Sequence, residues 1–139
     1  MTQIFYEDCP PFVIDQEKNV LKSIELIDKE GFTLGIVSFI FCSDDYLLKL
    51  NKEHLNHDYY TDVITFSYNE DQIISGDLFI SVDRVKENAN THNISFLNEL
   101  SRVAIHGLLH LCGYNDKSKE EVLIMRSKEK QYLKMIGFT

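Results

Sequence analysis

Residues 106–116 read His106-Gly-Leu-Leu-His110-Leu-Cys-Gly113-Tyr-Asn-Asp116. In a helix, two histidines at this spacing rise only ~6 Å along the axis and lie on nearly the same face. Gly113 is the residue type that commonly ends a helix, so the chain can turn back there and return Asp116 to the same place. The pattern H-x3-H-x5-D therefore predicts a helix and a turn that bring three side chains together.

These three side chains form a ligand set that suits one zinc ion. Three protein ligands with one open position are typical of a catalytic zinc site rather than a structural one. We therefore predict that His106, His110 and Asp116 bind a single Zn²⁺ ion. A carboxylate ligand makes the site less positive than three neutral histidines would, so other divalent metals are also expected to fit.

Each part of this pattern also has a plainer explanation. Paired histidines occur on ordinary helix faces, and Asp116 can instead cap the last helix. However, residues 103–112 are apolar almost all round, so this helix is expected to be buried, and buried imidazoles need polar partners. Ser118 and Glu121 already form a capping box for the last helix. Both observations favour the metal site.

Outward from this stretch, hydrophobic periodicity and turn residues predict about four strands and about five helices. The expected strands are residues 3–7, 33–42, 62–67 and 77–82, the last two joined as a hairpin-like pair. The expected helices are residues 15–30, 43–50, 83–90, 95–112 and 118–136. This order predicts an α+β fold, in which a small mixed sheet packs against helices and the metal-binding helix lies near the C-terminus.

Length and composition predict one domain over residues 1–139. No apolar run approaches the ~18 residues that span a membrane, and the N-terminal segment does not resemble a secretory signal. Three cysteines without a CxxC pair suit a reducing compartment. These features predict a cytoplasmic protein with no membrane partner.

The formal net charge of −8 argues against a broad nucleic-acid-binding surface. It leaves room for a local positive site. Gly107 stands where the H-E-x-x-H motif of metallopeptidases has its general-base glutamate, which makes peptidase activity less favoured. A glycine inside a helix costs about 1 kcal/mol relative to alanine, and a close approach by a strand or a substrate would explain it.

Three blocks of sequence resemble the YbeY family of bacterial rRNA-maturation endoribonucleases. Leu50-Asn51 is followed by Thr61-Asp-Val-Ile-Thr-Phe66, which is similar to the family's Thr-Asp-Val-Leu-Ser-Phe. Gly76-Asp-Leu-Phe-Ile-Ser81 is similar to its second block, and His106-Gly-Leu-Leu-His-Leu-Cys-Gly-Tyr114 matches its signature H-G-x-L-H-L-x-G-Y.

The resemblance implies a metal-dependent endoribonuclease that is specific for single strands. It implies ribosomal RNA as the substrate, maturation of the 3′ end of small-subunit rRNA, and a role in ribosome quality control. It also implies that the metal-binding helix lies beside the strand at residues 62–66. Two positions depart from the family pattern, because Asp116 stands where the family has histidine and Leu55 where it usually has an arginine.

The negative charge of the chain would repel an RNA substrate, so RNA binding needs an explanation. The metal with Arg84, Arg102 and nearby lysines would form a local positive cleft, or a partner on the small ribosomal subunit, such as a ribosomal protein, would recruit the substrate. Asp62 and Asp77 are candidates for contacting the ligating histidines from behind, although carboxylates at strand ends also bond to nearby backbone.

Aromatic and histidine side chains near the predicted site have two interpretations as well. Tyr59, Tyr60 and Tyr68 would stack on bases or simply pack. His54 and His57 would transfer protons or lie on the surface.

Three functions stay open at this point. The first is the endoribonuclease, the second a metzincin-like metallopeptidase with the same ligand spacing, and the third a metal-binding ribosome-assembly factor without nuclease activity. Leu55 favours the third function, and Gly107 disfavours the second.

Overall fold

A mixed four-stranded sheet organises the chain in the computed structural model, which describes residues 1–12, 14–56 and 59–138. The strand order is β1-β2-β4-β3. Both β1 and β4 run parallel to β2, whereas β3 pairs with β4 in antiparallel register. The strands are β1 (Thr2–Glu7), β2 (Thr33–Cys42), β3 (Val63–Ser67) and β4 (Ile73–Ser81).

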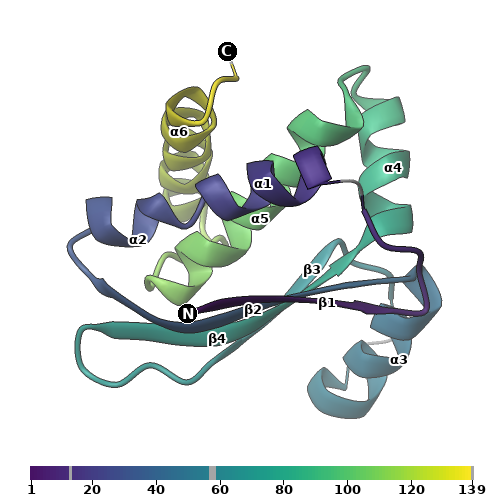
Figure 1. Ribbon diagram of the computed structural model, residues 1–139, viewed down its shortest axis with the longest axis horizontal. Coiled ribbons are helices and arrows are strands. Elements are labelled where there is room, and N and C mark those ends of the chain that lie inside the picture. The colour runs from purple at the N-terminus through teal and green to yellow at the C-terminus, as the bar shows by residue number, and fades with distance from the viewer. Residues whose placement is uncertain (13, 57–58, 139) are drawn as a thin grey trace.

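Helices cover both faces of this sheet. Figure 1 shows α3 on one face and α1, α2, α5 and α6 stacked on the other. The helices are α1 (Ile14–Lys22), α2 (Glu25–Lys29), α3 (Asp44–Leu55), α4 (Val82–Thr91), α5 (Phe96–Leu111) and α6 (Lys119–Met135). The expected α+β fold with its mixed sheet, and with the helix of both histidines near the C-terminus, is confirmed.

One predicted helix is interrupted. Residues 15–30 form two helices, α1 and α2, because the backbone tightens between them. The Ser23 hydroxyl donates to the Val20 carbonyl, and the Leu26 and Ile27 amides bond to carbonyls three residues back rather than four. Such i→i+3 bonds end an α-helix and restart it at a new angle.

The two C-terminal helices begin and end where the sequence predicts. Ser95 caps α5 by accepting from the Asn98 amide at 3.1 Å, and Gly113 follows the helix with a φ of +103°. Ser118 and Glu121 form the expected capping box of α6, with bonds of 3.1 and 2.9 Å. Asp116 is therefore not needed as a cap.

Two glycines let α5 approach the sheet closely. A Cβ atom at Gly107 would lie 2.5 Å from Leu78 Cδ2, and one at Gly76 would lie 2.5 Å from the Phe66 carbonyl and 2.8 Å from Leu111 Cδ2. Gly107 therefore makes room for the Leu78 side chain of β4, so of the two expected explanations the structure supports the close approach by a strand. The close packing sets the histidine face of α5 beside β3, at the edge of the sheet.

Two further observations concern the described residues as a whole. None of their helices is long and apolar enough to cross a membrane. Cys9, Cys42 and Cys112 are unpaired, and burial raises the pKa of the Cys42 and Cys112 thiols to about 12. These two cysteines therefore behave as small apolar side chains rather than as nucleophiles.

Candidate metal centre

The side chains of the three predicted ligands come together. His106 and His110 lie in the last two turns of α5, and Asp116 lies in the loop that follows this helix. His106 Nε2 and His110 Nε2 are 2.9 Å apart. Asp116 Oδ2 lies 3.2 Å from the first of these nitrogens and 3.5 Å from the second. Bonds of zinc length meeting at tetrahedral angles would place ligand atoms roughly 3.4 Å apart. The spacing of the three atoms therefore matches one shared ion.

Hydrogen-bond partners fix the tautomers of both histidines. His106 Nδ1 lies 2.7 Å from Glu129 Oε2, and His110 Nδ1 lies 2.9 Å from the Tyr114 carbonyl oxygen. Both partners are acceptors, so each Nδ1 carries the proton that it donates. In the neutral ring, each Nε2 then presents a lone pair toward the other ring and toward Asp116.

The chemistry of these three groups shows whether a cation fits between them. Two nitrogen lone pairs and one carboxylate oxygen point at a common centre, and such groups repel one another unless a positive charge lies between them. Imidazole and carboxylate are ligands of zinc and of several other divalent metals. His106, His110 and Asp116 are the cluster that fits a metal ion within the described part of the chain.

The centre opens on a cleft of about 380 Å³. Its wall consists of the end of α3, the segment before β3 and β3 itself, with both histidines and Asp116 at its base. The lining includes Asn51, Leu55, Tyr59, Thr61, Asp62 and Thr65. An extended ligand can therefore reach the three converging atoms from solvent.

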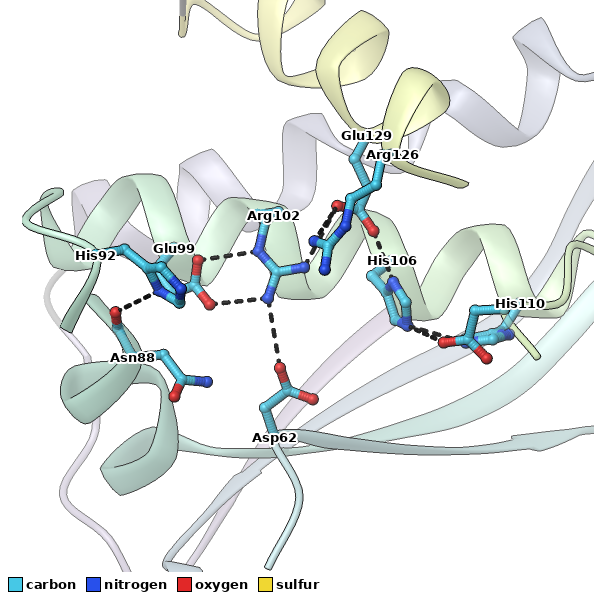
Figure 2. A network of polar contacts seen from close by, with 10 residues as sticks. Asp62, Asn88, His92, Glu99, Arg102, His106, His110, Arg126 and Glu129 are labelled. Atoms are coloured by element: carbon cyan, nitrogen blue, oxygen red, sulfur yellow. Dashed lines mark hydrogen bonds and ion pairs between the residues drawn. The ribbon is translucent and has the colours of Figure 1, made fainter. Parts of the chain in front are cut away.

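A buried carboxylate from α6 supports His106. The Glu129 side chain is only 3% exposed, and Arg102 and Arg126 both contact its Oε1, at 3.3 and 3.4 Å. Arg102 also makes a two-pronged bond to Glu99, at 2.9 and 2.8 Å. Figure 2 shows this network, with Arg102 between Glu99, Glu129 and Asp62 and with Glu129 reaching His106.

Opposite charges keep this network ionised despite its burial. Burial alone would raise the pKa of Glu129, but its hydrogen bond with His106 and the neighbouring charge of Arg102 lower it below its usual value. Burial likewise opposes the charge of Arg102, but its bond to Glu99 and the charges of Glu129 and Asp62 raise its pKa. An ionised Glu129 is the acceptor that the Nδ1 proton of His106 requires.

The predicted supporting carboxylates are placed differently from each other. Asp62 lines the cleft and pairs with Arg102 at 3.4 Å. Asp77 accepts a hydrogen bond from Tyr68 at 3.1 Å. The next residue, Leu78, packs against Gly107 and so lies on the sheet face that α5 covers. Successive residues of a strand point to opposite faces. Asp77 therefore lies on the face away from the histidines.

The predicted RNA-contacting arginines are both engaged by carboxylates. Arg102 is 20% exposed and contacts three acidic side chains. Arg84 is 25% exposed, pairs with Asp44 at 2.8 Å and with Glu87 at 3.4 Å, and lies over the Tyr60 ring. Neither guanidinium lines the cleft at the three ligands.

Of the predicted aromatic and histidine residues, Tyr59 lies at the cleft and is 56% exposed. Tyr60 lies against Arg84, and Tyr68 against Asp77. His54 packs edge-on against Phe66, on the side of the sheet that α3 covers. His57 lies outside the described residues.

Sequence reasoning missed Glu129, although a signal for it exists. Met125, Glu129 and Tyr132 are buried on one stripe of α6. An acidic residue on an otherwise apolar stripe requires a charged or hydrogen-bonding partner, and two histidines that need support offered one.

The fold and the centre together define a class, that of small α+β proteins in which two histidines and an aspartate form a candidate metal centre in an open cleft. Within this class, the chain belongs to the endoribonuclease YbeY family, whose family model matches residues 13–137.

Individual relatives support the same assignment. The Endoribonuclease YbeY of Flavobacterium psychrophilum is 46% identical over 125 residues, which are 89% of each chain. That of Flavobacterium johnsoniae is 52% identical over 101 residues, or 73% of each chain. The solution structure of TM1509 from Thermotoga maritima superposes with a TM-score of 0.68 at 30% identity and covers 98% of this chain and 89% of that one.

Proposed function

We propose that the protein is a metal-dependent endoribonuclease that cleaves single-stranded ribosomal RNA and acts in maturation of the 3′ end of small-subunit rRNA and in ribosome quality control. The observation that carries this proposal is the convergence of His106, His110 and Asp116 at the base of an open cleft. Membership of the endoribonuclease YbeY family supplies the reaction and the RNA substrate.

His106, His110 and Asp116 would hold the ion, and Zn²⁺ is the ion that we propose. A divalent cation supplies Lewis-acid chemistry, which polarises a phosphoryl oxygen and activates water for attack on phosphorus. The chain supplies the rest. Glu129 and the Tyr114 carbonyl orient the two imidazoles, and the cleft wall beside β3 positions an unpaired RNA strand.

Tyr59 provides the exposed aromatic ring of this wall. Stacking on an aromatic ring needs an unstacked base, and a single strand offers one. We propose the small ribosomal subunit, or one of its proteins, as the partner that brings the negatively charged enzyme to its substrate, and the cytoplasm as the place of action.

The two alternatives lack support at particular residues. A metallopeptidase needs a carboxylate base after the first histidine, and that position is Gly107, which packs against Leu78. A metal-binding assembly factor without nuclease activity would leave unexplained why the three predicted ligands face an open cleft of about 380 Å³.

The test is cleavage of a synthetic RNA that carries the 3′-terminal small-subunit precursor sequence. We expect cleavage of the single-stranded form only, loss of cleavage with a chelator, and recovery on adding back Zn²⁺ or another divalent metal. His110→Ala should be inactive. His92→Ala, which removes an exposed histidine whose Nδ1 faces the Asn88 carbonyl on α4, should be fully active. Cleavage that survives in His110→Ala would contradict the proposal.

A further inference from the structure

The cleft at the metal centre is poor in positive charge. None of the described residues that line it is a lysine or an arginine, and Asp62 and Asp116 bring carboxylates to it. A phosphodiester is an anion, and the chain as a whole carries a formal charge of −8. Beyond the ion itself, binding RNA therefore requires a cation from outside this cleft.

A second hollow meets the same centre from the side of α6. It measures about 200 Å³ and shares His106 and Asp116 with the cleft. Its remaining wall consists of Val122, Met125, Arg126 and Glu129. His106 and Asp116 therefore lie where the two hollows join, whereas His110 lines the cleft alone. A ligand strand that passes these two residues from the cleft would continue toward α6.

Arg126 differs from the other two arginines of the chain. Arg84 and Arg102 are 25% and 20% exposed, and each has a carboxylate within 2.8 Å. Arg126 is 60% exposed, and its ion pair to Glu129 is long, at 3.4 Å. That carboxylate is already engaged by His106 and Arg102, so the guanidinium of Arg126 keeps most of its hydrogen-bonding capacity for a ligand.

We propose that Arg126 is a substrate-binding residue, which holds an RNA phosphate adjacent to the scissile one in the hollow beside α6. This inference rests on the proposed nuclease function and names a contact that this function requires. A guanidinium suits the task because it binds a phosphate through two parallel hydrogen bonds. Val122 and Met125 form the apolar part of this wall, and Arg126 is the cation that offsets the carboxylates of Asp116 and Glu129 there.

The test compares Arg126→Gln, Arg126→Lys and Lys22→Gln with the wild type in the metal-loaded protein. Lys22→Gln removes the same charge from α1, which lines neither hollow. Binding of a fluorescein-labelled single-stranded RNA is followed by anisotropy over a range of salt concentrations, with RNA integrity checked on gels. Cleavage kinetics on the same RNA give KM and kcat separately, and thermal unfolding verifies the fold of each variant.

For Arg126→Gln we expect KM to rise about tenfold, as for loss of a charge-assisted hydrogen bond, with kcat nearly unchanged. The salt slope of binding should fall by about 0.7, the contribution of one phosphate contact in single strands. Arg126→Lys should keep the slope, and Lys22→Gln should resemble the wild type. If the wild type cleaves RNA but Arg126→Gln behaves like Lys22→Gln, the inference is wrong. If the wild type neither binds nor cleaves, the proposed function fails as well.

Discussion

The two histidines of the metal centre are held by different parts of the molecule. The Nδ1 atom of His110 bonds to the backbone of Tyr114, which follows it closely in the loop after α5. The Nδ1 atom of His106 bonds to the side chain of Glu129, which comes from α6. One histidine is therefore oriented by local chain geometry and the other by tertiary packing.

The two histidines therefore differ in their sensitivity to substitution of the group that orients them. A backbone carbonyl is present whatever the side chain, so the support of His110 survives substitution as long as the loop keeps its shape. A carboxylate is removed by a single substitution, and Glu129 is in addition one member of a buried ionic network.

Replacement of Glu129 should have the largest effect. Glu129→Ala leaves Arg102 without one of its partners in a buried environment, which should lower the free energy of unfolding by about 3 kcal/mol. It also frees the His106 ring, so zinc affinity should fall roughly 10- to 100-fold. Urea unfolding and competition with a chelating dye measure the two quantities.

Glu129→Gln is the matched control for this prediction. It keeps the size and an acceptor oxygen of the side chain but removes the charge. Its free energy of unfolding should therefore fall less than that of the alanine variant, while its zinc affinity should still be below that of the wild type. Wild-type zinc affinity in both variants would show that the supposed support of His106 has no effect on binding.

The same contrast between packing and local geometry applies to two glycines. Gly107→Ala would force a Cβ atom against Leu78, and such overpacking should cost about 2 kcal/mol. Gly113→Ala meets no atom within 4 Å, so its cost should be only the backbone strain of a positive φ, about 1 kcal/mol. Urea unfolding measures the free energy of unfolding of both variants. An equal decrease in the two would argue against close packing of α5 on β4.

A third prediction concerns Glu30, which supports the loop of His110 indirectly. Burial would raise the pKa of Glu30, but hydrogen bonds from Tyr114, Tyr132 and Lys128 lower it below its usual value. A lowered pKa stabilises the fold above the unfolded-state pKa of about 4.3, and this contribution is lost as the pH falls through the folded-state pKa.

Glu30→Gln should therefore lower the free energy of unfolding by about 1–2 kcal/mol at neutral pH. The difference from the wild type should shrink as the pH falls below about 4. Chemical unfolding at a series of pH values checks this, and a constant difference across the range would mean that Glu30 is not the titrating group.

The smallest effect is expected for Tyr114→Phe. The substitution removes the hydroxyl that donates to Glu30 at 2.5 Å but leaves the carbonyl that holds His110. The free energy of unfolding should fall by about 1 kcal/mol, with zinc affinity unchanged. A large loss of affinity would break the distinction between the backbone and side-chain supports.

Much of the site was predictable because its determinants are local. The spacing of His106 and His110, the helix end at Gly113 and the capping box at Ser118 all act within a few residues, and the structure places them as expected. The metal ligands themselves stay a prediction until an ion is measured. The presence of the four strands was predictable for the same reason, since each has its own pattern of β-branched and aromatic residues. The bounds of β4 were predicted less well, because the strand begins at Ile73 rather than at residue 77 and ends at Ser81, before α4 starts at Val82.

The parts that sequence reasoning did not predict depend on contacts between distant segments. Glu129 supports His106 only because α6 packs beside α5, and Asp77 lies on the far face because Leu78 takes the place under Gly107. The break at Ser23 depends on a side-chain bond that helical periodicity does not report.

The most direct test of this account is the metal content of the purified, dialysed protein. Elemental analysis should find about one divalent ion per chain in the wild type. It should find almost none in His106→Ala, His110→Ala and Asp116→Ala, each of which must remain folded by circular dichroism. A folded wild type without metal, or ligand variants that keep the full amount, would contradict the claim that these three side chains share one ion.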